Sequence, residues 1–490
     1  MSTKQKSLKL NFIMNAILTV STFLFPLITF PYVSRVLLPE GLGRVDFAVS
    51  VATYLSMFAQ LGIPTYGIRI CSQESDDRIQ LSRTVHELLI INSVMCAITY
   101  VIFGIALFCV PKFAEDKLLF IITGSTVLFN AVGAEWLYRA IEQYKYITVR
   151  SIVFKFIALV AIFVFIHSPD DYHLYGGIAI FAASASNVLN FINLRKHISM
   201  RYLGGYDLKR HMRPVFIFFA MSCATTIYTY LDTIMLGFIK NDEVVGYYTV
   251  AVKIKAILVS LITSLGTVLM PRASYFIAHK QMDDFHRIIK KAINFVMVAS
   301  IPLTVYFMLY AFEGIMFLSG DEYGPSVLPM QIVMPTLIFI GLSNISGIQM
   351  LIPLGRERTV LLSVIIGAGV NLVVNCFTIP LFGAAGAAIG SLTAEAVVLA
   401  VQFVVLRKEL ICAYKSVHYL PIILGTALGG LASYFTKNLE WGMFLRLATS
   451  AVIFFGVYLV VLVVFKEPLV LEVSKQGADK LKGLLHRGEK

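Results

Sequence analysis

The segment Thr225–Thr267 combines apolar runs with charged side chains, and it decides the fold class of the chain. Its first part reads Thr225-Thr226-Ile227-Tyr228-Thr229-Tyr230-Leu231-Asp232, and its second contains Tyr248-Thr249-Val250-Ala251-Val252-Lys253-Ile254-Lys255. Both parts lie in apolar stretches long enough to cross a membrane. An ionised side chain at the centre of a bilayer costs about 2.5–3.5 kcal/mol on insertion scales. We therefore expect Asp232, Lys253 and Lys255 to face a partner, a cavity or a substrate path.

Helical periodicity separates the two lysines, because residues two positions apart on a helix point in nearly opposite directions. Lys255 shares its face with apolar residues, so snorkelling or a helix contact is the favoured interpretation for it. Lys253 and Asp232 are interpreted as lumen residues, and the alternative is a structural ion pair between packed helices. The face of Lys253 is small or polar, consisting of Gly246, Thr249, Ala256, Ser260, Ser264 and Thr267.

Composition places the chain among polytopic membrane proteins. Of its 490 residues, 58% are hydrophobic and only 14% are charged. Six cysteines are scattered with no close pair, which argues against a disulfide scaffold or a zinc site. The net charge of +12 is divided into short basic clusters between apolar runs, so we expect no nucleic-acid partner. The lipid bilayer is the expected surrounding.

Apolar runs of roughly 17–25 residues are the unit of this fold. We predict an all-α polytopic protein with about fourteen transmembrane helices. Their ranges are 10–33, 44–63, 86–110, 118–137, 151–167, 174–193, 215–239, 245–269, 293–312, 326–350, 359–380, 384–406, 419–436 and 442–465. The loops between them are too short for a folded extramembrane domain, so function must lie in or between the helices.

Lysines and arginines in the short loops set the orientation. With both termini cytoplasmic, the inner segments hold 31 of the 41 basic residues and the outer loops hold six. We therefore predict a multi-pass membrane protein with both termini inside.

Reporter fusions at Tyr202 and Asn241 should give opposite sidedness. The loop 193–214 is expected inside because it holds six basic residues, whereas the loop 239–247 holds only Lys240. Phosphatase and fluorescent-protein fusions measure this directly, and the same sidedness at both positions would contradict the fourteen-helix arrangement.

An internal repeat predicts the domain organisation. Glu40-x-x-Gly43 and Glu243-x-x-Gly246 each follow one predicted span and open the next, in the same orientation. We predict two six-helix halves, residues 1–200 and 201–410, around a central cavity. The halves are expected to rock against each other between inward-open and outward-open states. Residues 411–465 form two further transmembrane helices, and 466–490 form a cytoplasmic tail.

Other charges complete the candidate site. Arg35 ends the first span and either lines the outer mouth of the cavity or meets lipid headgroups. Arg69 follows the second span and either reaches an inner vestibule or is an ordinary inner-loop cation. Glu395 lies in the middle of the twelfth span, and Lys155 is placed near the inner end of the fifth.

The sequence lacks the motifs of an ATPase or a hydrolase, so we predict a transporter and not an enzyme, with no cofactor and no metal. Transport then uses a gradient or the membrane potential. Proton or sodium coupling through Asp232 or Glu395 stays open.

The chain resembles the polysaccharide transporters of the multidrug/oligosaccharidyl-lipid/polysaccharide exporter superfamily, in particular the O-antigen and capsule repeat-unit flippases (Wzx type). The resemblance rests on the 6+6+2 layout and on four stretches: Tyr32–Gly43, Leu231–Gly237, Val245–Lys255 and Leu269–Arg272. It implies transfer of undecaprenyl-pyrophosphate-linked oligosaccharide from the inner to the outer leaflet of the bacterial cytoplasmic (inner) membrane, for surface polysaccharide synthesis. It also implies a polysaccharide polymerase and a chain-length regulator as partners.

The related lipid II flippases use arginines from spans 1, 2 and 8 in a cationic cavity, so the resemblance implies a similar cavity here. Arg35 and Lys253 match spans 1 and 8 here, with Lys255 nearby. Span 2 has cations only at its ends, Arg44 and Arg69, so this chain departs from the three-cation pattern. Two alternatives are a cation-coupled multidrug or metabolite exporter and a non-transporting membrane scaffold.

Overall fold

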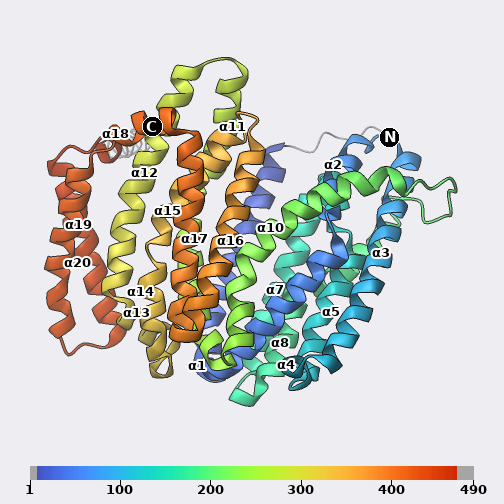
Figure 1. The fold of residues 1–490 in the computed structure, drawn as a ribbon, viewed down its shortest axis with the longest axis horizontal. Coiled ribbons are helices and arrows are strands. Elements are labelled where there is room, and N and C mark those ends of the chain that lie inside the picture. Colours follow the sequence, from blue (N-terminus) through green and yellow to red (C-terminus); the bar gives the residue numbers. More distant parts are fainter. Residues whose placement is uncertain (1–7, 472–490) are drawn as a thin grey trace, which may run out of the picture. The chain divides into compact units, whose positions relative to one another are not determined.

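The computed structural model describes residues 8–471, which form helices and no strand (Figure 1). The all-α polytopic fold is therefore confirmed. Contacts divide the chain into two compact units, residues 1–249 and 250–490, and the division falls inside one long helix, α11. The predicted division into halves at residue 200 stays a prediction.

The first unit is built from long apolar helices joined by short ones. Its elements are α1 (Leu8–Gln60), α2 (Ile63–Gln73), α3 (Arg78–Cys109), α4 (Pro111–Ala114), α5 (Lys117–Gly133), α6 (Glu135–Ala140), α7 (Tyr144–Phe165), a 3₁₀ turn (Pro169–Asp171), α8 (Tyr172–Ile180), a π-helix (Phe181–Ala185), α9 (Asn187–Leu194), α10 (Lys209–Ile239) and the start of α11 (Asp242–Ala278).

The second unit continues from α11. Its elements are α12 (Met282–Leu309), α13 (Ala311–Ser319), a 3₁₀ segment (Asp321–Ser326), α14 (Val327–Val333), α15 (Thr336–Asn344), a π-helix (Ile345–Leu351), α16 (Glu357–Phe382), α17 (Ala384–Val405), α18 (Arg407–Lys415), α19 (Tyr419–Tyr434), a 3₁₀ turn (Phe435–Asn438) and α20 (Met443–Val464).

Eleven helices among the described residues are long and apolar enough to cross a membrane, or twelve if a pair bent by 45° at Met334–Pro335 is one span. The number of fourteen therefore stays a prediction. Two predicted spans, 10–33 and 44–63, lie in the single element α1, and the predicted span 118–137 corresponds to α5, which has only 17 residues.

The break in α1 lies at Leu38, where φ is 59° and ψ is 174°. Leu38 precedes Pro39, and a proline disfavours the helical conformation of the residue before it. Pro26 and Pro31 also lie in α1, but Leu38 is the residue with non-helical angles. The sequence thus marks this bend by a proline, at the junction of the two predicted spans.

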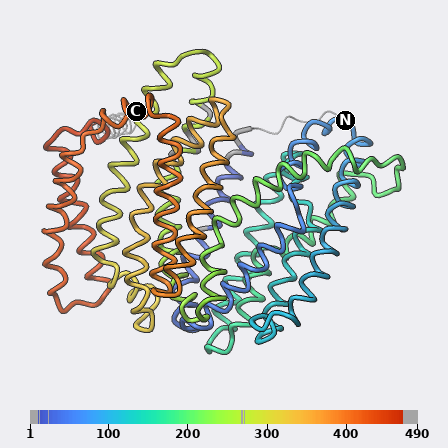
Figure 2. The backbone as a smooth tube through the Cα atoms, viewed as in Figure 1, coloured from blue at the N-terminus to red at the C-terminus, as the bar shows by residue number. Residues whose placement is uncertain are grey.

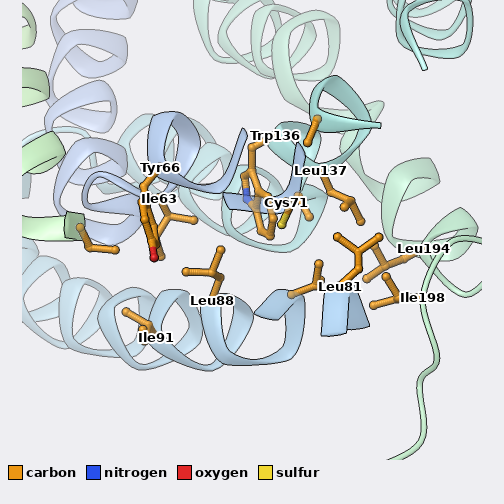
Figure 3. Close-up of a cluster of buried hydrophobic side chains, with 14 of the residues drawn as sticks. Ile63, Tyr66, Cys71, Leu81, Leu88, Ile91, Trp136, Leu137, Leu194 and Ile198 are labelled. Carbon is orange, nitrogen blue, oxygen red and sulfur yellow. The ribbon is translucent and has the colours of Figure 1, made fainter. Parts of the chain in front are cut away.

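A hydrophobic cluster fixes α2, α3 and α6 against the start of α10 in the first unit (Figure 3). A Cβ atom added to Gly62 would lie 2.4 Å from the carbonyl oxygen of Val215, so the turn after α1 touches the backbone of α10. The members of the hydrophobic cluster that Figure 3 labels are Ile63, Tyr66, Cys71, Leu81, Leu88, Ile91, Trp136, Leu137, Leu194 and Ile198.

A buried charge cluster lies beside these apolar side chains. Glu87 of α3 accepts hydrogen bonds from the backbone N–H of Asp207 (2.8 Å) and from Nη2 of Arg210 (2.6 Å), and it lies 2.7 Å from Nε2 of His211. Burial raises the pKa of Tyr66, so its phenol keeps the proton and can donate to Nδ1 of His211 at 2.9 Å. The cluster therefore ties the 195–208 connector and α10 to α2 and α3.

Glu87→Gln should destabilise the protein by about 1.5–3 kcal/mol, because it weakens hydrogen bonds to a buried charge. The thermal unfolding midpoint of the purified protein in detergent measures this. Glu115→Gln is the control, because that side chain is 66% exposed and its ion pair with Lys112 is long, at 3.6 Å. Equal midpoints for both variants would contradict a stabilising role of the Glu87 charge.

Hydrogen bonds join the α19–α20 hairpin to α12 in the second unit, and Figure 2 follows the hairpin in red and orange. Tyr306 donates to the carbonyl oxygen of Leu447 (3.0 Å), and Tyr458 donates to that of Val298 (2.7 Å). Asn294 donates to Glu467 at 2.6 Å. The last two predicted spans are thus bonded into this unit. The remainder of the predicted tail, 472–490, lies outside the described residues.

Candidate functional site

Two helices of the first unit cross at glycines, Gly43 in α1 and Gly246 in α11. A Cβ atom added to Gly43 would lie 1.7 Å from the carbonyl oxygen of Asp242, and one added to Gly246 would lie 1.9 Å from that of Pro39. No side chain fits at either position, so the two backbones touch. Each contact reaches the residue four positions before the other glycine, so the crossing is reciprocal.

The reciprocal crossing joins the two motifs that define the predicted repeat. Glu40-x-x-Gly43 opens the second part of α1, and Glu243-x-x-Gly246 opens α11. Both segments begin just after a break in the chain, at Leu38 and at Lys240–Asn241. The two motifs therefore occupy equivalent positions at the contact.

Charged residues surround the crossing. Asp242 pairs with Nζ of Lys112 at 2.9 Å and with Nε of Arg44 at 3.6 Å. Arg44 also pairs with Glu40 at 2.6 Å and donates to the Tyr172 hydroxyl at 3.0 Å. Because these side chains come from α1, α4, α8 and α11, the ion pairs reinforce the helix contact at this end of the unit.

A cavity of about 70 Å³ lies among these charges, lined by Arg44, Phe47, Lys112, Glu115, Asp116, Leu119, Phe120 and Asp242. Small-molecule sites usually measure roughly 300–1,000 Å³, so this cavity holds a few water molecules and no saccharide. Its cations are already paired with carboxylates. The ion pairs therefore leave no unpaired cation among these lining residues for an anionic ligand.

Asp232 of α10 is a buried carboxylate, with 5% of its surface exposed. The Tyr248 hydroxyl of α11 donates to its Oδ2 at 2.5 Å. One turn earlier on α10, the carbonyl oxygen of Ile227 accepts from the Tyr54 hydroxyl of α1 at 3.2 Å. Tyrosines from α1 and α11 therefore fix α10 around this carboxylate.

The other predicted site residues are distributed over several elements. Arg35 is exposed on α1, and Arg69 is exposed on α2. Lys253 and Lys255 are half-buried on α11, and Glu395 is half-buried on α17. Asp232 belongs to the first unit, whereas Lys253, Lys255 and Glu395 belong to the second. A joint site, and the Lys253–Asp232 relationship, stay predictions.

An internal ion pair of the first unit escaped the sequence analysis. Glu135 accepts from Nη2 of Arg139 (2.7 Å) and of Arg150 (3.0 Å), and Arg150 also donates to the carbonyl oxygen of Ser186 (3.0 Å). Only the Glu135–Arg139 spacing of four residues is visible in the sequence. The Arg150 contact depends on the left-handed turn at Ala134, which separates α5 from α6.

Lys155 lies near the middle of α7, and its depth in the membrane stays a prediction. The sequence analysis placed it near the inner end of a span starting at residue 151, but α7 begins at Tyr144, so Lys155 is the twelfth of 22 residues. It lies about 15 Å from either helix end. The polar residues 144–150 hid the true start of the helix. Lys155 donates to the Ser21 hydroxyl of α1 at 3.0 Å.

Comparison with known families gives two matches. The family described as polysaccharide biosynthesis protein matches residues 8–277. The family described as MatE matches residues 218–377. A protein of Escherichia coli (strain K12) named "Putative O-antigen transporter" is 25% identical over 84% of this chain and 100% of its own length.

Solved structures show the same fold. The lipid II flippase MurJ in an inward closed conformation superposes with a TM-score of 0.73 and 15% identity, covering 94% of this chain and 100% of that chain. An inward-facing multidrug resistance MATE family transporter of the MOP superfamily gives a TM-score of 0.61 and 13% identity, covering 83% and 99%. This chain therefore shares the fold of these two proteins.

Proposed function

The chain belongs to the family of polysaccharide biosynthesis proteins, and from this we propose that it is a flippase for undecaprenyl-pyrophosphate-linked oligosaccharide. It moves the repeat unit from the inner to the outer leaflet of a bacterial cytoplasmic membrane, for surface polysaccharide synthesis. The family match over residues 8–277 is the observation that carries the proposal. The named O-antigen transporter, which this chain spans in full, supports the same substrate class.

Transport proceeds by alternating access between two helical halves. The reciprocal contact of Gly43 and Gly246 supports this, because equivalent helix starts that meet at glycines can pivot against each other. The ion pairs of Asp242 with Lys112 and Arg44 hold this end of the first unit closed. When this end opens, these ion pairs break and water hydrates the separated charges.

The proposed substrate contacts are cations that hold the pyrophosphate while the lipid tail stays in the bilayer. They are Lys253, Arg35, Lys255 and Arg69, of which Lys253 lies on the polar face of its helix. An inside-negative potential favours outward movement of anionic charge by about 2.3 kcal/mol per charge per 100 mV. Asp232 and Glu395 are the proposed residues for proton or sodium coupling.

The cellular test removes the protein from its host. Lipid-linked oligosaccharide should accumulate on the inner leaflet and surface polymer should disappear, while drug sensitivity stays unchanged. Increased drug sensitivity with normal surface polymer would instead favour a multidrug exporter, for which the MatE match over residues 218–377 is the supporting observation. Copurification tests the proposed polymerase and chain-length regulator partners.

A further inference from the structure

Two cations of α7 have very different surroundings. Arg150 is buried and has three partners, Glu135 at 3.0 Å, the carbonyl oxygen of Ser186 at 3.0 Å and Oδ1 of Asn187 at 3.3 Å. Lys155 has a single hydrogen-bond partner among residues 8–471, the neutral hydroxyl of Ser21. Arg150 is therefore a structural cation, whereas the ammonium of Lys155 has donors to spare.

The Ser21 hydroxyl does not depend on Lys155. It donates its own proton to the carbonyl oxygen of Leu18 at 2.6 Å, and only its lone pair faces the ammonium. Ser21 is itself 5% exposed. Removing the lysine therefore leaves no unsatisfied donor on α1, which is unusual for a charge in the middle of a membrane helix.

Polar contacts attach the first half of α1 to α7 and to the turn that precedes α7 at Glu142. Asn11 donates to Glu142 (3.0 Å), Thr148 donates to the carbonyl oxygen of Met14 (3.0 Å), and Lys155 donates to Ser21 (3.0 Å). Three rungs thus hold this half of α1 along one face. The Lys155 rung is the one that includes a cation, near the middle of α7.

The rest of the first half of α1 is exposed, and part of that surface is polar. Asn15, Thr19 and Thr22 are all exposed and follow each other at steps of four and three residues, so they share one helix face. Polar groups and a charge in a membrane-spanning helix are unfavourable against lipid. Lys155 is half-buried and meets α1 at Ser21, about 100° around the helix from Thr22. Its ammonium therefore lies next to this polar face and not on it.

We propose that Lys155 binds the phosphate groups of the lipid-linked substrate as they pass this face of the first unit. The inference rests on the proposed function and adds a cation that the sequence analysis had assigned to the membrane surface. A phosphate oxygen is a stronger partner for an ammonium than a hydroxyl. When the substrate arrives, Nζ of Lys155 stops donating to the Ser21 oxygen and donates to phosphate oxygens instead. The Ser21 hydroxyl keeps its hydrogen bond to the carbonyl oxygen of Leu18.

Two variants separate this role from a structural rung. Lys155→Met removes the charge but keeps the length of the side chain. Ser21→Ala removes the hydroxyl but leaves the ammonium free to bind phosphate. A structural rung requires both partners and loses function in both variants, whereas a binding role requires only the lysine. Thr148→Val, which breaks the neighbouring rung, is the matched control.

The experiment measures binding of undecaprenyl pyrophosphate to the full-length protein in lipid nanodiscs, with undecaprenol and inorganic pyrophosphate as neutral and lipid-free probes. We expect Lys155→Met to weaken binding by about tenfold or more, as for loss of one charge-assisted hydrogen bond. Lys155→Arg should retain most of the binding. Ser21→Ala and Thr148→Val should stay within about threefold of the wild type.

Unchanged binding in Lys155→Met, or an equal loss in Ser21→Ala, would overturn the role of Lys155 while the proposed function stands. Wild-type protein that does not bind undecaprenyl pyrophosphate would contradict the proposed substrate itself, and the inference with it. Equal affinity for inorganic pyrophosphate would overturn the lipid-linked assignment, because a soluble anion would then suffice.

Discussion

Gly246→Ala is expected to abolish transport while the protein remains in the membrane. The new methyl group would lie 1.9 Å from the carbonyl oxygen of Pro39, so α11 and α1 must move apart. The ion pairs of Asp242 with Lys112 and Arg44 lie beside this contact and would lengthen with it. Because overpacking a tight contact costs about 1–3 kcal/mol, the population of the closed state falls by about 5- to 150-fold.

Restoration of surface polymer in a strain lacking the protein measures this effect, with immunoblots to confirm membrane levels. Gly43→Ala should give the same result, since the crossing is reciprocal. Gly104→Ala is the control, because a Cβ atom at that position of α3 meets nothing within 4 Å. Full activity of Gly246→Ala would show that the closed crossing is not needed for transport.

Lys253→Ala is also expected to reduce transport at least about tenfold, because a charge-assisted contact to phosphate is lost. Lys253→Arg should keep part of the activity, since the charge remains while the geometry changes. Lys255→Met should be milder, as its helical neighbours are apolar. Rates of surface polymer recovery in the deletion strain rank the three variants.

The double variant Lys253→Ala with Asp232→Asn decides between binding and structure. If the two residues form only a buried ion pair, removing both charges restores function, because no unpaired charge is left. Continued inactivity supports substrate binding by Lys253. Asp232→Asn alone keeps a hydrogen-bond acceptor for the Tyr248 hydroxyl, so the local packing of α10 and α11 should survive.

Hydropathy predicts most of this fold because a chain in a bilayer must satisfy its backbone within helices. The long apolar runs therefore locate helices such as α3, α16 and α20. The repeat motifs around Gly43 and Gly246 could also be recognised in the sequence, and glycine allows close backbone approach. The reciprocal contact between these two glycines could not be predicted, because it depends on how two distant segments pack.

Polar residues near helix ends limit what the sequence shows. The Tyr144–Arg150 segment reads as a loop by composition but forms the first turns of α7, and this moves Lys155 into the middle of the helix. Glu87 and His211 are more than a hundred positions apart, and neither carries a local motif that predicts their contact. Pairing between distant helices, and not propensity, determines these sites.

The most direct test of the account is transport of purified lipid-linked oligosaccharide in proteoliposomes that contain this protein alone. Oligosaccharide labelled in one leaflet should become accessible to an impermeant glycosidase from the other, and faster when a potential favours anion movement in that direction. The Gly246→Ala protein should show the rate of empty liposomes. No difference between wild-type proteoliposomes and empty liposomes would contradict a flippase function.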